Sequence, residues 1–147
     1  MKLIFKFKRL ISIALLAVMM STMLIVPASA YGDTYSMGGV AFTRSNGSVY
    51  AWGNIWSYGE RNRSLAGEIR STYSADLTLW LYIYARNMET REFEDIPACF
   101  IDYDSTLVEG YCPLDPYLYE PSGASADFYV DSNVIFYEYE EGWNPLF

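Results

Sequence analysis

Hydrophobic and polar residues alternate with a period of two along much of the chain, which is typical of half-buried β-strands. The clearest run covers residues 77–87. Its odd positions are mainly aliphatic, and its even positions are mainly polar or aromatic. An antiparallel sheet with one solvated face buries the side that carries fewer polar groups. We therefore expect Leu79, Leu81 and Ile83 in the core, and Trp80, Tyr82 and Tyr84 on the outer face.

A second alternating run covers residues 49–58 and carries Tyr50, Trp52 and Trp56 on one side. The other side offers only small or single aliphatic residues, namely Val49, Ala51, Gly53, Ile55 and Ser57. Protein interiors are densely packed, so such a face has too little volume to fill a core. The pattern predicts that Tyr50, Trp52 and Trp56 point inward.

Turn residues divide the chain into short elements. Asn46-Gly47 between residues 39–44 and 49–57 predicts a type I′ hairpin turn, with positive φ at both residues. Ser74-Ala75-Asp76 predicts a turn between residues 65–73 and 77–87, and Pro97 is expected to end the strand at 91–96 because proline cannot donate to a ladder. The remaining expected elements are strands 99–103 and 106–112, a proline-containing loop 113–123, and a hairpin 124–131 and 134–140 turned at 132–133.

About eight short strands and no helix are expected. This pattern predicts an all-β fold, a single small antiparallel β-sandwich or barrel.

The first thirty residues have the three parts of a secretory signal peptide. Basic residues precede an apolar run at 10–26, and Pro27 is followed by Ala28-Ser29-Ala30, a typical cleavage site. We expect residues 1–30 to be removed and residues 31–147 to form one secreted, extracellular and bacterial β-rich domain. An uncleaved membrane anchor is the alternative, because the apolar run lies at the lower limit for spanning a bilayer.

The charge balance narrows the range of partners. Residues 31–147 hold six arginines and eighteen acidic residues, which gives a formal net charge of −12. Such a field repels nucleic acid and anionic lipid, so neither nucleic acid nor a membrane is an expected partner. The charge suits solubility, a cationic partner or calcium.

Cys99 and Cys112 are the two cysteines of the chain. In an exported protein an even number of cysteines indicates a disulfide. A metal or redox pair is the alternative, but it lacks the close spacing and any histidine. The sequence therefore predicts a Cys99–Cys112 disulfide.

The chain contains no histidine, which excludes Ser-His-Asp and Cys-His catalysis and removes the commonest zinc ligand. No glycine-rich phosphate loop is present. Carboxylate chemistry remains open, through pairs such as Glu92 with Glu94 or Asp102 with Asp104. Asp102, Asp104 and Glu109 could also form an irregular calcium site. The expected assignment is nevertheless no catalytic residue, no metal and no cofactor.

Aromatic residues are the richest candidate feature, with fourteen Tyr and four Trp. Exposed rings on a sheet can stack on sugars or anchor a protein partner. We therefore expect a secreted, non-enzymatic binding protein that contacts an extracellular glycan or protein through Trp80, Tyr82 and Tyr84. The alternatives are a bacteriocin-like antagonist and a small carboxylate-dependent carbohydrate-active enzyme.

Overall fold

The computed structural model describes residues 35–59, 63–140 and 143. This part of the chain forms six β-strands and no helix, which confirms the all-β prediction. The strands are β1 (Tyr35–Thr43), β2 (Val49–Tyr58), β3 (Ser64–Asn87), β4 (Phe93–Cys112), β5 (Tyr119–Val130) and β6 (Asn133–Glu138). The expected sandwich of eight strands is wrong, because the six strands form one curled antiparallel sheet. The predicted signal peptide lies outside the described residues.

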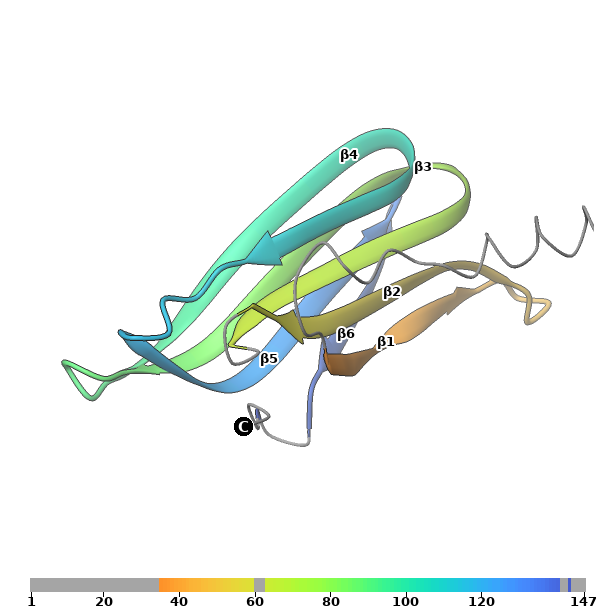
Figure 1. The fold of residues 1–147 in the computed structure, drawn as a ribbon. Helices are drawn as coiled ribbons and strands as arrows, with labels where there is room; N and C mark the ends of the chain where they lie inside the picture. The colour runs from red at the N-terminus through yellow and green to blue at the C-terminus, as the bar shows by residue number, and fades with distance from the viewer. Residues whose placement is uncertain (1–34, 60–62, 141–142, 144–147) are drawn as a thin grey trace, which may run out of the picture. The chain divides into compact units, whose positions relative to one another are not determined.

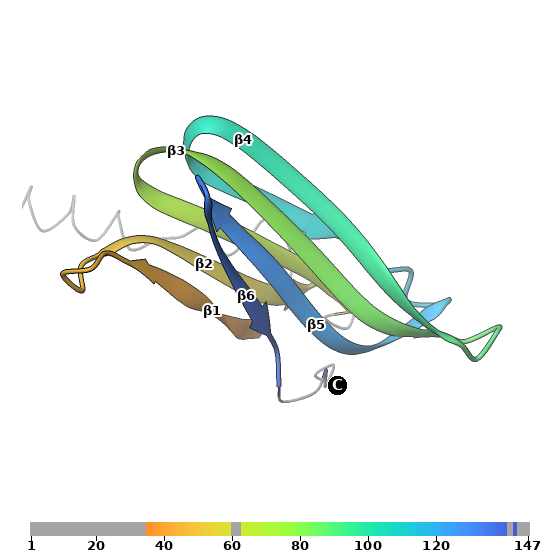
Figure 2. The same ribbon diagram turned by 180° about the vertical axis from the view of Figure 1, so that it is seen from behind.

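β3 is the central strand of the sheet, and it changes partners halfway along its length. Its residues 64–71 pair with β2, whereas residues 77–87 pair with β5. β4 follows the opposite edge of β3 through both halves. Figures 1 and 2 show the long β3–β4 hairpin, with β1 and β2 on one half and β5 and β6 on the other. We call these the N-terminal half-sheet and the C-terminal half-sheet.

Three predicted strand breaks are absent from the structure, and one of them is the break between residues 103 and 106, which both lie within β4. The Ser74-Ala75-Asp76 segment is a bend within β3, where Ala75 pairs with Ser105 between two register shifts. Ala75 is buried, so the bend lies against the core rather than in a solvent-exposed turn. Pro97 lies inside β4 and pairs with Tyr82. An edge strand tolerates proline, because the missing N–H can lie on the side without a neighbouring strand.

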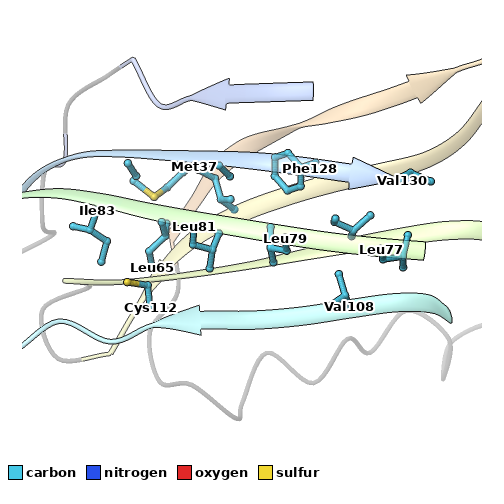
Figure 3. Close-up of a cluster of buried hydrophobic side chains, with 14 of the residues drawn as sticks. Met37, Leu65, Leu77, Leu79, Leu81, Ile83, Val108, Cys112, Phe128 and Val130 are labelled. Carbon is cyan, nitrogen blue, oxygen red and sulfur yellow. The ribbon is translucent and has the colours of Figure 1, made fainter. Parts of the chain in front are cut away.

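The core lies on the concave side of the curled sheet, where the two half-sheets face each other (Figure 3). Leu79, Leu81 and Ile83 are fully buried, as the alternation predicts. Phe128 of β5 lies against Gly53 of β2, so close that a Cβ at Gly53 would overlap the phenyl ring. The aromatic side chain of one half-sheet therefore fills the space above a glycine of the other.

The first hairpin is confirmed, but its turn differs from the predicted one. The Gly47 N–H donates to the Arg44 carbonyl at 2.8 Å, and Gly47 has a φ of 81°. Asn46 has no positive φ, so the turn is not type I′. The Asn46 side chain instead accepts a hydrogen bond from the Ser48 N–H at 3.0 Å, as Asn commonly does in turns.

The predicted orientation of the tryptophans in β2 is wrong. Tyr50 is buried, but Trp52 is 37% exposed and Trp56 is half-buried on the outer face. A β-bulge explains the split: Ala51 pairs with Phe42, and the next pair joins Val49 to Thr43. Tyr50 is therefore the extra residue of the bulge. The alternation of inward and outward side chains is interrupted there, so Tyr50 and Trp52 need not point to the same face.

The predicted Cys99–Cys112 disulfide is also wrong, because both cysteines are free. Both lie on β4, where Cys99 pairs with Trp80 and Cys112 pairs with Leu65. Trp80 belongs to the outer face and Leu65 to the core, so the two thiols leave the sheet on opposite sides. A disulfide needs facing Cβ atoms, which this arrangement does not provide.

Candidate binding face

The convex side of the C-terminal half-sheet carries Trp80, Tyr82 and Tyr84, as the alternation of residues 77–87 predicts. Tyr84 is 45% exposed, and Trp80 and Tyr82 are half-buried. The fully buried leucine and isoleucine positions between them fix this orientation, because successive side chains of a strand point to opposite faces. The binding role of the three residues remains a prediction.

The rings on this face are arranged in two parallel pairs. Trp80 and Tyr82 have ring centroids 6.1 Å apart and planes 10° apart. Tyr84 stacks on Phe93 of β4, with centroids 5.0 Å apart and planes 10° apart. Neighbouring strands add exposed Phe136 and half-buried Tyr129. We call these six residues the outer aromatic face: Trp80, Tyr82, Tyr84, Phe93, Tyr129 and Phe136.

Asp127 of β5 lies within the outer aromatic face. The register pairs it with Trp80 on one side and with Phe136 on the other. Tyr129 follows two residues later on the same face of β5. The Tyr82 hydroxyl donates a hydrogen bond to the Asp127 carboxylate at 3.2 Å. A carboxylate is therefore held among four aromatic side chains, one of which orients it.

The surroundings of Tyr82 keep its hydroxyl in the donor form. Burial raises the pKa of Tyr82 above its usual value, and the charge of Asp127 and the hydrogen bond to it act in the same direction. Each of these effects disfavours a tyrosinate beside a carboxylate. Tyr82 is therefore a neutral hydrogen-bond donor at physiological pH.

A groove of about 590 Å³ continues from this site along the C-terminal half-sheet. The groove is lined by Tyr82 and Tyr84 of β3 and by Gly123 and Ser125 of β5. Three carboxylate side chains also line the groove: Asp95, Glu138 and Glu140. Gly123 pairs with Tyr84, and a Cβ at this glycine would meet only the Tyr84 Cβ, at 3.8 Å.

The convex side of the N-terminal half-sheet is also aromatic, but its charges are already paired. Trp52 lies opposite Arg70, which hydrogen-bonds Glu68 at 2.8 Å and approaches Glu109 at 3.7 Å. At the other end of this face, Tyr58 and Tyr111 meet edge to face, with centroids 6.2 Å apart. The outer face of the C-terminal half-sheet differs in two ways. It has a groove, and its carboxylates make no ion pair with the described residues.

The acidic residues that the sequence suggests for catalysis or calcium binding either make structural hydrogen bonds and ion pairs or form no common site. Glu94 accepts hydrogen bonds from Asn87 at 3.1 Å and from the Tyr119 hydroxyl at 3.1 Å. This bond to Glu94 raises the pKa of Tyr119. Glu109 belongs to the Arg70 cluster. Among the described residues, no group of three or more His, Cys, Asp or Glu side chains could hold a metal ion, and the calcium candidates Asp102, Asp104 and Glu109 form no such group.

Sequence reasoning identified three of the six aromatic residues of this face and missed Asp127. The signal was present: residues 124–131 place Ala124, Ala126, Phe128 and Val130 on one side and Ser125, Asp127 and Tyr129 on the other. The pairing of Asp127 with Trp80 depends on register between distant strands, which the alternation within one strand does not give.

Within the described part of the chain, no helix is long and apolar enough to cross a membrane. Comparison of the chain with models of protein families, with curated proteins and with solved structures found no match. Proposals about function therefore rest on the residues of the face itself.

Proposed function

We propose that the protein is a non-enzymatic carbohydrate-binding protein, secreted through its N-terminal segment, that contacts an extracellular glycan with its outer aromatic face. The observation that carries this proposal is the row of Trp80, Tyr82 and Tyr84 beside a groove with polar lining. These rings lie on a strand whose opposite face is fully buried, so the scaffold holds them in place before any ligand arrives.

The chemistry of the face suits a sugar. A pyranose ring presents C–H groups on its faces and hydroxyl groups around its rim. Flat aromatic side chains can cover the C–H faces, and they supply a large contact area at low entropic cost. Carboxylates such as Asp95 and Glu138 accept hydrogen bonds from hydroxyl groups, and bonds to charged acceptors are the stronger ones. The two residue types together match both parts of the ligand.

The experiment is a glycan array probed with labelled protein of residues 31–147, followed by calorimetry on the glycans that bind. Trp80→Ala is the test variant, and Trp52→Ala is the matched control because Trp52 lies on the outer face of the other half-sheet. We expect Trp80→Ala to weaken binding at least about tenfold, or about 1.4 kcal/mol, and Trp52→Ala to leave it unchanged. Absence of glycan binding would overturn the proposal, as would equal losses in both variants.

A protein partner is the second candidate, favoured by aliphatic residues around the same face. Ile101 is 53% exposed and Val134 is 52% exposed, and both flank the Thr78–Tyr129 pair. Branched aliphatic side chains lack the flat surface that a sugar needs, but they fit the apolar centre of a protein interface. Binding to a protein that is lost in Val134→Asp, with no glycan bound on the array, would favour this function.

A further inference from the structure

We propose that Asp127 and the rings around it form a subsite for a protonated amine, and that the glycan is a chain of free amino sugars. This inference rests on the proposed function and adds the chemical class of the ligand. It predicts that a glucosamine chain binds better than the same chain with acetylated, uncharged nitrogens.

The subsite combines the two kinds of group that attract an organic cation. Aromatic faces attract ammonium groups through the ring quadrupole, and Trp is the strongest of them. Trp80 and Phe136 flank Asp127 across the strands, and Tyr82 holds the carboxylate through its hydroxyl. A cation above Asp127 would therefore meet a full negative charge and aromatic rings together.

No basic side chain of the described residues neutralises this carboxylate. The ion pairs in this part of the chain belong to Arg70, on the other half-sheet. The Tyr82 hydroxyl supplies one hydrogen bond but no positive charge. A ligand that brings a cation would supply the missing charge without displacing an arginine.

The groove beside the subsite is also negatively charged, so it can attract the amines of further sugar units. Asp95, Glu138 and Glu140 line it, and its described lining contains no lysine or arginine. Ser125 lies in the groove two residues from Asp127 on the same face of β5, so the groove and the subsite are continuous. A chain that carries an amine on each unit can place successive charges along these carboxylates, whereas a neutral chain gains only its stacking and hydroxyl contacts.

The test is calorimetry with two oligosaccharides of equal length, one of glucosamine and one of N-acetylglucosamine, at moderate salt. We expect the glucosamine chain to bind the unaltered protein at least about tenfold more tightly, because the charged contact adds to the stacking. Asp127→Asn should remove most of this preference while leaving the residual affinity close to that for the acetylated chain. Thermal unfolding of Asp127→Asn establishes that the variant is folded.

Asp102→Asn is the control for general charge attraction. Asp102 is exposed and pairs with Leu77, so it belongs to the opposite side of the sheet from Asp127. We expect its removal to change the preference less than about twofold. Equal losses in Asp102→Asn and Asp127→Asn would show a general attraction of a polycation to an acidic protein and would overturn the subsite.

The remaining outcomes separate this inference from the proposed function. Equal binding of the two oligosaccharides overturns the amine subsite and leaves glycan binding intact. Binding of neither, with other glycans bound on the array, also overturns the subsite alone. Binding of no glycan overturns both proposals. A lysine-rich peptide that binds as tightly as the glucosamine chain, with the same dependence on Asp127, would overturn the assignment to a sugar.

Discussion

Phe128 of β5 lies directly against Gly53 of β2, and this contact joins the inner faces of the two half-sheets. Phe128 is fully buried. The glycine is required for space, because any side chain at position 53 would occupy the volume of the phenyl ring. The contact therefore determines how closely the two halves of the curled sheet can approach.

Replacement of Gly53 by Ala is expected to lower the free energy of unfolding by about 1–3 kcal/mol, because the added methyl group overpacks the core. Gly123→Ala is the matched control. It lies in β5, and its Cβ would meet only the Tyr84 Cβ, at an ordinary 3.8 Å. Urea denaturation of both variants checks this prediction. A Gly53→Ala variant as stable as Gly123→Ala would show that the half-sheets do not pack as described.

The sequence predicts side-chain orientations correctly where they depend on one strand alone. It does not predict those that depend on pairing or packing with distant strands. The alternation in residues 77–87 correctly placed Leu81 inside and Trp80 outside. The small volume of the other side chains of β2 wrongly predicts Trp52 inside, because it considers β2 alone. The space above Gly53 is filled by Phe128, which lies far away in the sequence. The bulge at Tyr50 could not be read from the alternation either, because it is set by pairing with β1.

The number of strands was overestimated for a related reason. The segment at 74–76 and Pro97 both carry local signals that favour a break, and both lie inside long strands. β4 pairs with β3 on both sides of the bend and through Ala75–Ser105 within it, so tertiary pairing overrides the local turn preference of the segment at 74–76. The predicted cysteine pairing failed because an even count says nothing about which face of a strand each thiol occupies.

The neighbouring positions Trp80 and Leu81 are expected to respond differently to truncation. Leu81→Ala should cost about 2–5 kcal/mol, because Leu81 is fully buried and its removal leaves a cavity. Trp80→Ala should cost about 1 kcal/mol or less, because half-buried outer-face residues contribute little packing. Thermal melts of the two variants test the orientation of β3. A larger loss for Trp80→Ala would reverse the inner and outer faces.

The two thiols are expected to differ in reactivity rather than to be bonded. In the native protein a small alkylating reagent should modify Cys99, which is partly exposed on the outer face, and leave Cys112 unmodified until the protein unfolds. Mass spectrometry of peptides after native and denatured labelling measures this. A linked Cys99–Cys112 peptide under non-reducing conditions would contradict the register of β4.

The burial of Cys112 also predicts that the free energy of unfolding decreases at high pH. Burial raises the pKa of its thiol from about 9 to about 11, so the thiol in the unfolded chain loses its proton first. The stability that this group contributes is complete below about pH 9 and is lost as the pH rises toward 11. Chemical denaturation across this range should show a shallower decline for Cys112→Ala than for Cys99→Ala. Identical slopes would contradict the burial of Cys112.

Glycan binding by the outer aromatic face is tested by an NMR titration of the labelled protein with the glycan that binds best on the array. We expect the indole N–H signal of Trp80 and the backbone signals of Tyr82, Tyr84 and Asp127 to shift with the ligand concentration. The signals of Trp52 and Trp56, on the other half-sheet, should stay in place. Shifts confined to Trp52 and Trp56, or shifts spread evenly over both half-sheets, would contradict the assignment of binding to the outer aromatic face.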